Sequence, residues 1–195
     1  MSKLDRYGWF DDWVGAYLDW DITLTPAMIS SPKRFLELVG AEFLPSKEPC
    51  GLPALADEGD SEHVLVGVAP APGNPGWVLG AESPAGVSYE KVSELSVPGV
   101  AVSFHCNEDS GAWFTWAEDG DLLVEFSLTD GGVIDGSDPE RFVAKMREAG
   151  LDPDDVAHPC AAAALLIEMI TGVTITPEIL ETTKFISGSV PFPWF

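Results

Sequence analysis

The sequence predicts an α+β fold in which a mainly antiparallel sheet of about five or six strands carries helices packed mainly on one face. Residues 100–128 give the first reason, because they contain three successive β-forming runs separated by turn sequences. The second reason is a pair of segments that open on Ser-Pro or Asp-Pro and close on glycine, as helices do. With 195 residues and 46% apolar content, residues 1–195 are expected to form a single domain with its own core.

Three antiparallel strands between Val100 and Leu128 are the clearest prediction. The alternating apolar residues of the first and third strands are expected to face the core: Val100, Val102, Phe104 and Cys106, then Leu122, Val124, Phe126 and Leu128. Residues 107–111 form the first turn, and the β-forming residues 112–117 form the middle strand. The Asp119-Gly120 pair tolerates the positive φ of a tight hairpin, so the third strand folds back on the second.

The N-terminal part of the chain contains an aromatic segment, a strand, a helix and a long connection. Aromatic residues recur at helical spacing within residues 1–20, which indicates a core or docking face; a ligand cage is the alternative. Residues 21–27 alternate as a strand. Residues 31–40 form a helix with a Ser cap and Pro in its first turn. Residues 43–62 lack a sustained period and are predicted to be a long acidic surface connection or a mobile flap.

Two strands and a short helix precede the three central strands. The strands, residues 63–69 and 76–81, are joined by a proline-rich loop. Its Gly73-Asn74-Pro75-Gly76 sequence has no following Lys-Ser or Lys-Thr, which excludes a phosphate-binding P-loop. Residues 88–95 are predicted to form a helix capped by Ser88.

Three helices and an aromatic tail follow the central strands. Residues 137–149 form an amphipathic helix, residues 159–171 are apolar nearly all round and form a buried one, and residues 176–180 form a short one. The Ser31, Ser137 and Pro159 helices are expected to cover the same face of the sheet. The tail, residues 184–195, carries four aromatic side chains, so it either packs on its own domain or binds another chain.

Charge is the strongest chemical feature of the chain. The net charge is −22, with only ten Lys and Arg residues, which argues against direct binding of nucleic acid or of an anionic membrane. Every charged residue between Val92 and Glu140 is acidic. This surface either keeps the protein soluble or attracts a basic partner.

The sequence gives no sign of a metal, a cofactor or a disulfide framework. The three cysteines are far apart and lack a Cys-x-x-Cys spacing. Residues 151–155 lack the residue order of a calcium loop and are expected to form a turn with helix-capping aspartates. Neither a signal peptide nor an apolar run of membrane-spanning length is recognisable, so we expect a cytoplasmic protein.

Catalytic signals are weak. No serine lies in a Gly-x-Ser-x-Gly elbow, and no pair of histidines has a metal-binding helical spacing. His105 is the one weak catalytic candidate, because it lies on the non-core face with Ser103 and near Thr115 or Glu125 of neighbouring strands. A histidine beside a carboxylate could act as a general base. A surface histidine in a satisfied cross-strand pair is the simpler interpretation.

Several motifs together resemble a known family. They are the Ser-Pro helix of residues 31–40, the strand with Trp77 and Glu82, the Asp138-Pro139-Glu140 helix start, and the Thr-Gly-Val-Thr-Ile-Thr-Pro-Glu-Ile-Leu run of residues 171–180. In this order the elements resemble an uncharacterised bacterial family of high-GC Gram-positive genomes, known only as a domain of unknown function. The resemblance implies a shared fold, and it supplies no activity and no catalytic residues.

We therefore expect a non-enzymatic acidic protein-binding module, most concretely an immunity-type or inhibitor protein that neutralises a basic toxin or nucleic-acid enzyme. The predicted contact residues lie in the central strands and their turns: Glu108, Asp109, Trp113, Glu118, Asp119, Asp121 and Glu125. One alternative is a small-ligand binder or hydrolase with a cleft around His105. The other is a structural or regulatory subunit that forms homo-oligomers through its aromatic tail.

Overall fold

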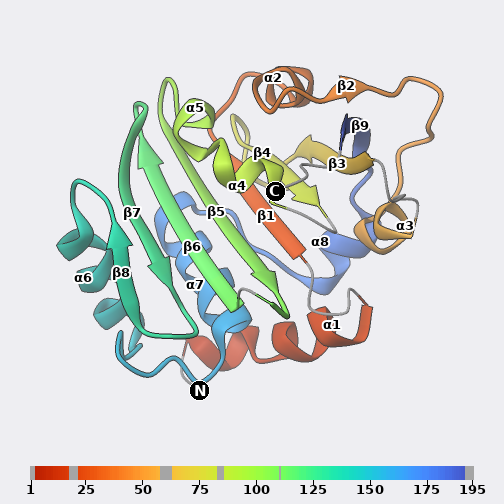
Figure 1. Cartoon of the computed structure of the whole chain (residues 1–195). Helices are drawn as coiled ribbons and strands as arrows, with labels where there is room; N and C mark the ends of the chain where they lie inside the picture. Colours follow the sequence, from red (N-terminus) through yellow and green to blue (C-terminus); the bar gives the residue numbers. More distant parts are fainter. Residues whose placement is uncertain (1–2, 18–21, 58–62, 83–85, 110, 192–195) are drawn as a thin grey trace.

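One antiparallel sheet organises the described part of the chain (Figure 1). The computed structural model describes residues 3–17, 22–57, 63–82, 86–109 and 111–191. Within these residues the sheet has nine strands in the order β2-β9-β3-β4-β1-β5-β6-β7-β8, and every neighbouring pair is antiparallel. The strands are β1 (Ile22–Ala27), β2 (Glu42–Phe43), β3 (His63–Pro70), β4 (Val78–Glu82), β5 (Val100–Asn107), β6 (Gly111–Glu118), β7 (Asp121–Ser127), β8 (Gly132–Asp135) and β9 (Ile186–Pro191).

The α+β class and the antiparallel sheet are confirmed, but the predicted number of strands was too low. Two of the additional strands, β2 and β8, are short, and a register shift between Glu125 and Phe126 interrupts the pairing of β7 with β8. The third, β9, is rich in Gly and Ser and lacks alternation, yet it lies between β2 and β3. Residues 186–191 of the tail therefore pack on their own chain, whereas residues 192–195 lie outside the described residues.

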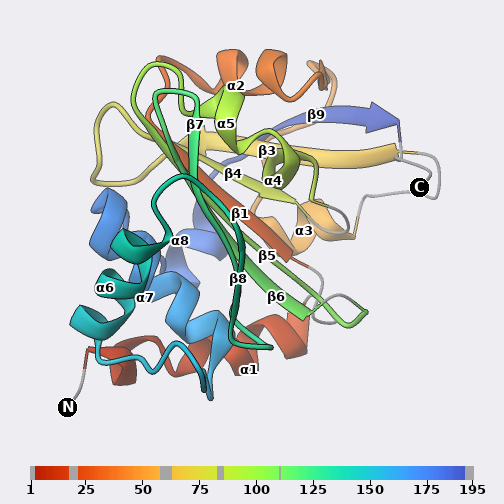
Figure 2. The same cartoon turned by 60° about the vertical axis from the view of Figure 1, so that its left-hand side comes forward.

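Helices cover both faces of the sheet (Figure 2). On the first face lie a 3-10 helix and five α-helices: η1 (Leu4–Tyr7), α1 (Trp9–Tyr17), α3 (Leu52–Ala56), α6 (Pro139–Ala149), α7 (Pro159–Thr171) and α8 (Pro177–Thr182). On the second face lie α2 (Pro32–Leu38), α4 (Val87–Glu90) and α5 (Val92–Leu95). The prediction that the Ser31 helix shares a face with the Ser137 and Pro159 helices is wrong.

The position of α2 follows from a close contact with β4. A Cβ built on Gly80 would lie 2.3 Å from Cζ of Phe35, so the aromatic ring of α2 packs directly on the backbone of β4. Phe35 belongs to the second hydrophobic core together with Val66 and Val78. An amphipathic pattern shows that a helix buries one side, but it does not show which face of a sheet receives that side.

The first face holds the larger core, and α7 runs through its centre. Residues 160–167 of α7 are all buried, as its uniformly apolar sequence predicts. Phe114 of β6 stacks on Phe142 of α6 with ring centroids 5.1 Å apart, and Phe126 of β7 lies 5.3 Å from the same ring. The alternation along β5 to β7 therefore points most of its apolar residues toward α6 and α7. Leu122 is the exception: a register shift between Trp116 and Ala117 places it against the second core, and Leu123 joins Val124 in the first.

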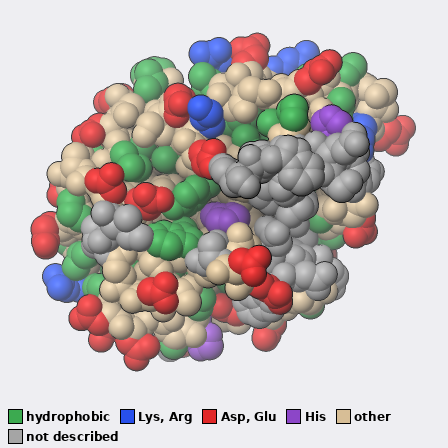
Figure 3. Space-filling view, in the orientation of Figure 1, with side chains coloured by type: hydrophobic (Ala, Val, Ile, Leu, Met, Phe, Trp, Pro, Cys, Tyr) green, Lys and Arg blue, Asp and Glu red, His purple; other side chains and the backbone are tan. Residues whose placement is uncertain are grey.

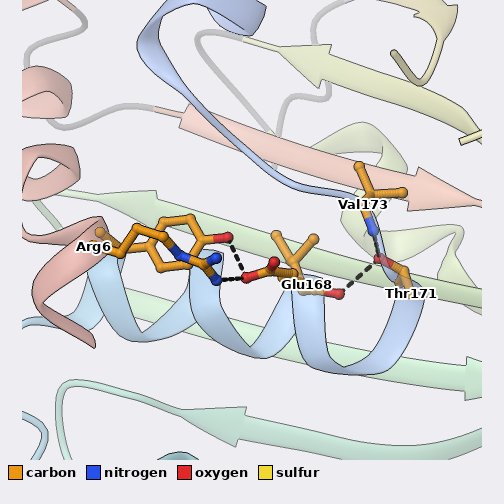
Figure 4. A network of polar contacts seen from close by, with 6 residues as sticks. Arg6, Glu168, Thr171 and Val173 are labelled. Atoms are coloured by element: carbon orange, nitrogen blue, oxygen red, sulfur yellow. Dashed lines mark hydrogen bonds and ion pairs between the residues drawn. The ribbon is translucent and has the colours of Figure 1, made fainter. Parts of the chain in front are cut away.

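The N-terminal aromatic segment is part of this core. Tyr7, Phe10 and Trp13 are all at least nine-tenths buried. Glu168 of α7 accepts hydrogen bonds from Arg6 and from the Tyr7 hydroxyl, the latter at 2.7 Å (Figure 4). Burial, and then the Glu168 carboxylate, raises the pKa of Tyr7. These contacts favour the core interpretation of the segment over a ligand cage.

The connection between β2 and β3 is better anchored than the sequence suggested. It contains the short helix α3, whose Leu52 and Leu55 are fully buried against the first face. Cys50 forms an antiparallel bridge with Phe185, just before β9. Gly51, Leu52 and Leu55 are therefore buried rather than part of a surface connection, while residues 58–62 lie outside the described residues.

Candidate functional site

The second face of the sheet changes from apolar under α2 to polar under α4. The buried polar side chains of this region come from β1, β4, β5, β6 and α4, and each is at most 3% exposed: Thr23, Thr25, Glu82, Ser88, Ser103 and Thr115. Hydroxyl groups removed from water need hydrogen-bond partners. Thr25 supplies two, because its Oγ1 shares hydrogen bonds with Ser88 Oγ at 2.8 Å and with Ser103 Oγ at 2.7 Å.

Glu82, the last residue of β4, holds α4 in place. Its two carboxylate oxygens accept hydrogen bonds from the backbone N–H groups of Val87, at 2.7 Å, and Ser88, at 2.9 Å. The side chain is fully buried, and this burial raises the pKa of Glu82 to about 7, although the hydrogen bonds from Ser88 and Val87 oppose the rise. Glu82 thus binds the first turn of α4 from five residues before it, at the end of β4.

The predicted helix over residues 88–95 needs correction on two points. It consists of two separate short helices, α4 and α5. Ser88 lies inside α4 rather than at its cap, and its hydroxyl bonds to Thr25. The sequence could not show this, because Glu82 provides the acceptors that a capping serine would otherwise supply.

His105 lies at the edge of this polar group with both ring nitrogens in hydrogen bonds. Asn107 Nδ2 lies 3.1 Å from Nε2, and Thr23 Oγ1 lies 2.8 Å from Nδ1. Since an amide nitrogen only donates, the network assigns the proton to Nδ1, which donates to Thr23. Burial lowers the pKa of His105, which favours this neutral form.

Tyr89 lies between His105 and the carboxylate that the sequence suggested as its neighbour. The Tyr89 hydroxyl donates to Glu125 Oε1 at 2.5 Å, and the Tyr89 ring lies 5.7 Å from the His105 ring. Burial and the hydrogen bond to Glu125 raise the pKa of Tyr89. The Glu125 carboxylate is therefore held by Tyr89, while His105 bonds to Thr23 and Asn107. This arrangement differs from the direct His–carboxylate contact that the general-base interpretation requires.

The predicted contact residues divide between the two ends of β6. Glu118, Asp119 and Asp121 lie at the turn from β6 to β7, whereas Glu108 and Asp109 lie at the turn from β5 to β6. The strand of 8 residues separates these ends by about 23 Å at about 3.3 Å per residue. The structure thus does not bring the two acidic turns together.

The carboxylates at the β6–β7 turn serve local structure. Glu118 forms a two-bond pair with the Arg141 guanidinium of α6, at 2.9 and 2.8 Å, and this guanidinium lies 4.4 Å from the Trp116 ring centroid. Asp119 accepts from Gly99 N at 2.9 Å, and Asp121 accepts from Ser137 Oγ at 2.7 Å. These bonds tie the turn to the loop before β5 and to the loop before α6.

The other end of the central strands carries a second acidic group, which we call the meander surface. It combines the half-buried Trp113 and Glu125 of the second face with four exposed carboxylates, so its members are Glu108, Asp109, Trp113, Glu125, Asp130 and Asp135. Thr129 Oγ1 accepts from Ala112 N at 2.8 Å and joins the β7–β8 turn to the start of β6. Asp130 and Asp135 were not among the predicted contact residues, although both lie in the span without Lys or Arg.

Figure 3 shows this side of the molecule. Acidic side chains are spread over the whole view, whereas most of the few basic ones lie toward its upper edge, and a histidine is visible near the middle. Among the described residues no group of three or more His, Cys, Asp or Glu side chains is placed to hold a metal ion. The same part of the chain contains no helix that is both long and apolar enough to cross a membrane.

Fold and surface together define an acidic α+β protein built on one antiparallel sheet, with a second face that is polar beneath α4 and an acidic meander. The chain belongs to the family described as "Family of unknown function (DUF6461)", whose model matches residues 2–193. Neither the comparison with curated proteins nor the comparison with solved structures found a match.

Proposed function

We propose that this protein is a binding module for a basic protein partner and that the meander surface makes the contact. The observation that carries the proposal is the composition of that surface: a half-buried tryptophan is accompanied by carboxylates from two strands and two turns. No lysine or arginine occurs between Val92 and Glu140 to neutralise them. Tryptophan is enriched at binding hot spots, and a field of one sign attracts and orients an oppositely charged partner.

The polar group beneath this surface favours binding over catalysis. His105 uses both ring nitrogens in internal hydrogen bonds, and the Tyr89 hydroxyl is bonded to Glu125. A general base needs a nitrogen or oxygen that reaches the substrate proton. The internal bonds instead hold His105 in place beside Trp113, its partner across β5 and β6. The hydrolase alternative therefore has less support than the binding module.

The biological role that we propose is inhibition of the immunity type, in which the acidic surface occupies a basic site on a toxin or a nucleic-acid enzyme. Such a basic site normally faces phosphate groups. A protein surface with carboxylates around an aromatic side chain could compete for it. Rim charges mainly affect the association rate, so binding is expected to weaken steeply as salt is added.

A capture experiment with charge-matched variants tests the proposal. The test variant carries Glu108→Gln, Asp109→Asn and Asp130→Asn on the meander surface. The control carries Glu48→Gln, Asp57→Asn and Glu178→Gln, three exposed carboxylates near α3 and α8. Each variant loses the same charge, so general electrostatics are equal.

Wild type and control are expected to capture the same basic protein from host extract in about 50 mM salt, and the meander variant is expected to lose it. About 500 mM salt should release it from wild type. Capture by the meander variant equal to wild type, or capture that salt does not weaken, would refute the proposal. Inhibition of the captured protein's activity by wild type then tests the immunity role.

A further inference from the structure

The end of the central strands that carries the β6–β7 turn exposes two large apolar side chains. Met28, in the loop after β1, is 41% exposed, and Val97, in the loop between α5 and β5, is 55% exposed. They are the large hydrophobic residues with the highest exposure among the described residues. Single exposed apolar residues are common, so their surroundings decide whether they have a role.

Backbone hydrogen bonds join the loops that carry these side chains. Met28 N donates to Val100 O at 2.8 Å, which ties the first loop to the start of β5. Asp119 N donates to Gly99 O at 2.8 Å, and Gly99 N donates to the Asp119 carboxylate. Gly120 N donates to Ser96 Oγ at 2.8 Å. Three loops that are distant in sequence are thus held as one structural unit.

Two glycines let backbone lie directly against the apolar side chains. A Cβ on Gly99 would lie 3.0 Å from Met28 Sδ, and a Cβ on Gly120 would lie 3.1 Å from Val97 Cγ2. Both glycines have positive φ, at 123° and 88°, a conformation that side chains disfavour. We call Met28, Val97, Gly99 and Gly120 the apolar platform. Because its geometry is already fixed, a partner would lose little entropy in ordering it.

The rim of the platform carries negative charge. Asp119 and Asp121 of the β6–β7 turn are exposed. Glu118 and Glu94 lie in the same region but are paired with Arg141 and Lys91. The unbalanced charge of the rim therefore comes from the two aspartates. An apolar centre within a charged rim is the general anatomy of a protein interface.

We infer that the apolar platform is a docking site for a protein segment that places one large apolar side chain against Met28 and Val97 and a neighbouring Lys or Arg against Asp119 and Asp121. The inference rests on the proposed function only in that the partner is a basic protein. It adds a site at the opposite end of β6 from the meander surface, with its own recognition chemistry.

The probe for this site is a displayed library of random 12-residue peptides selected on the immobilised full chain. Selected peptides are then titrated by fluorescence polarisation against wild type, Val97→Ser, Met28→Ser and Asp119→Asn/Asp121→Asn. Val190→Ser is the matched control, because this half-buried valine lies in β9, which β3, β4 and β1 separate from β5 in the sheet. A melting curve of each variant shows whether it is folded.

Selected peptides are expected to pair a large apolar residue with an adjacent Lys or Arg. Their affinity should fall about tenfold or more in Val97→Ser and Met28→Ser, a change equal to about 1.4 kcal/mol, and remain within about twofold in Val190→Ser. The aspartate variant should bind more weakly and with less dependence on salt. Failure to enrich peptides, or equal affinity of folded Val97→Ser and wild type, would overturn the inference.

The two proposals fail in distinguishable ways. Peptides that lose affinity for the meander variant Glu108→Gln/Asp109→Asn/Asp130→Asn but not for Val97→Ser overturn the platform and leave the proposed function standing. A second outcome is that peptides bind the platform through apolar residues alone. If salt, Asp119→Asn/Asp121→Asn and Glu108→Gln/Asp109→Asn/Asp130→Asn then all leave the affinity unchanged, the partner is not basic, and both proposals are contradicted.

Discussion

The two faces of strands β5 to β7 differ in the kind of side chain that they bury. On the first face Phe104, Phe114 and Phe126 are buried beneath α6 and α7. On the second face their neighbours in sequence, Ser103, Thr115 and Glu125, belong to a hydrogen-bonded group beneath α4. Apolar burial is non-directional, whereas hydrogen bonds require fixed geometry. The first face therefore supplies stability, and the second positions α4 and the side chains under the meander surface.

Phe114→Ala is expected to have the largest effect, because it removes a fully buried ring that stacks on Phe142. Truncating a buried phenylalanine typically costs about 3–5 kcal/mol in free energy of unfolding. Thr115→Ala at the next position on the opposite face should cost about 1 kcal/mol, the scale of one hydrogen bond. Urea unfolding of both variants measures the contrast. If both variants lose the same free energy of unfolding, the two faces contribute equally to stability and the proposed difference between them is wrong.

Glu82 should give the second-largest effect, in the dependence of stability on pH. Its pKa is about 7 in the folded protein and near 4.5 in the unfolded chain. Between these values the folded state binds more protons, so the free energy of unfolding falls as pH rises, by about 3 kcal/mol in total. Below about pH 4.5 both states are protonated, and above about pH 7 both are ionised.

The measurement compares wild type with Glu82→Gln by urea unfolding between pH 4.5 and 8. His105 acts in the opposite direction, because its lowered pKa makes stability rise as pH rises toward its unfolded value of about 6.5. Both proteins contain His105, so subtracting the Glu82→Gln stability profile from that of wild type removes the His105 contribution. Glutamine loses one acceptor for the α4 amides at every pH, which adds a constant offset. Parallel profiles would show that Glu82 does not titrate in this range.

Alternation predicted the strands whose two faces differ in polarity, and it failed where that contrast is missing. The core side was correct for β5 and for β7 from Val124 onward, because Phe104 and Phe126 alternate with polar residues. It was wrong for Leu122, since alternation cannot show the register shift beside Ala117. In β9 small residues, Ser187 and Gly188, are buried between β2 and β3, so neither face gives an apolar signal. The face that receives α2 was also missed, since Gly80 marks the contact only when the packing is known.

The candidate site was partly visible in the sequence. Register along β5 to β7 placed His105, Thr115 and Glu125 on the same face, and the structure agrees. The residue that separates His105 from Glu125 is Tyr89, which comes from α4 and lies 36 positions before Glu125. Its position depends on α4, whose first amides bond to the buried Glu82, and the sequence shows neither the burial of Glu82 nor the contact of Tyr89 with Glu125.

The smallest expected effect tests whether the second face works as a connected group. Ser103→Ala removes one of the two hydroxyl contacts of Thr25, which keeps its bond to Ser88. We expect a loss of about 1 kcal/mol, compared with less than about 0.5 kcal/mol for Ser189→Ala, a half-buried serine of β9. If the hydroxyls position α4, hydrogen exchange at the Val87 and Ser88 amides should also accelerate, although both amides bond to Glu82 rather than to Ser103. An unchanged exchange rate would mean that Glu82 alone holds α4, and the hydroxyls would then only satisfy one another.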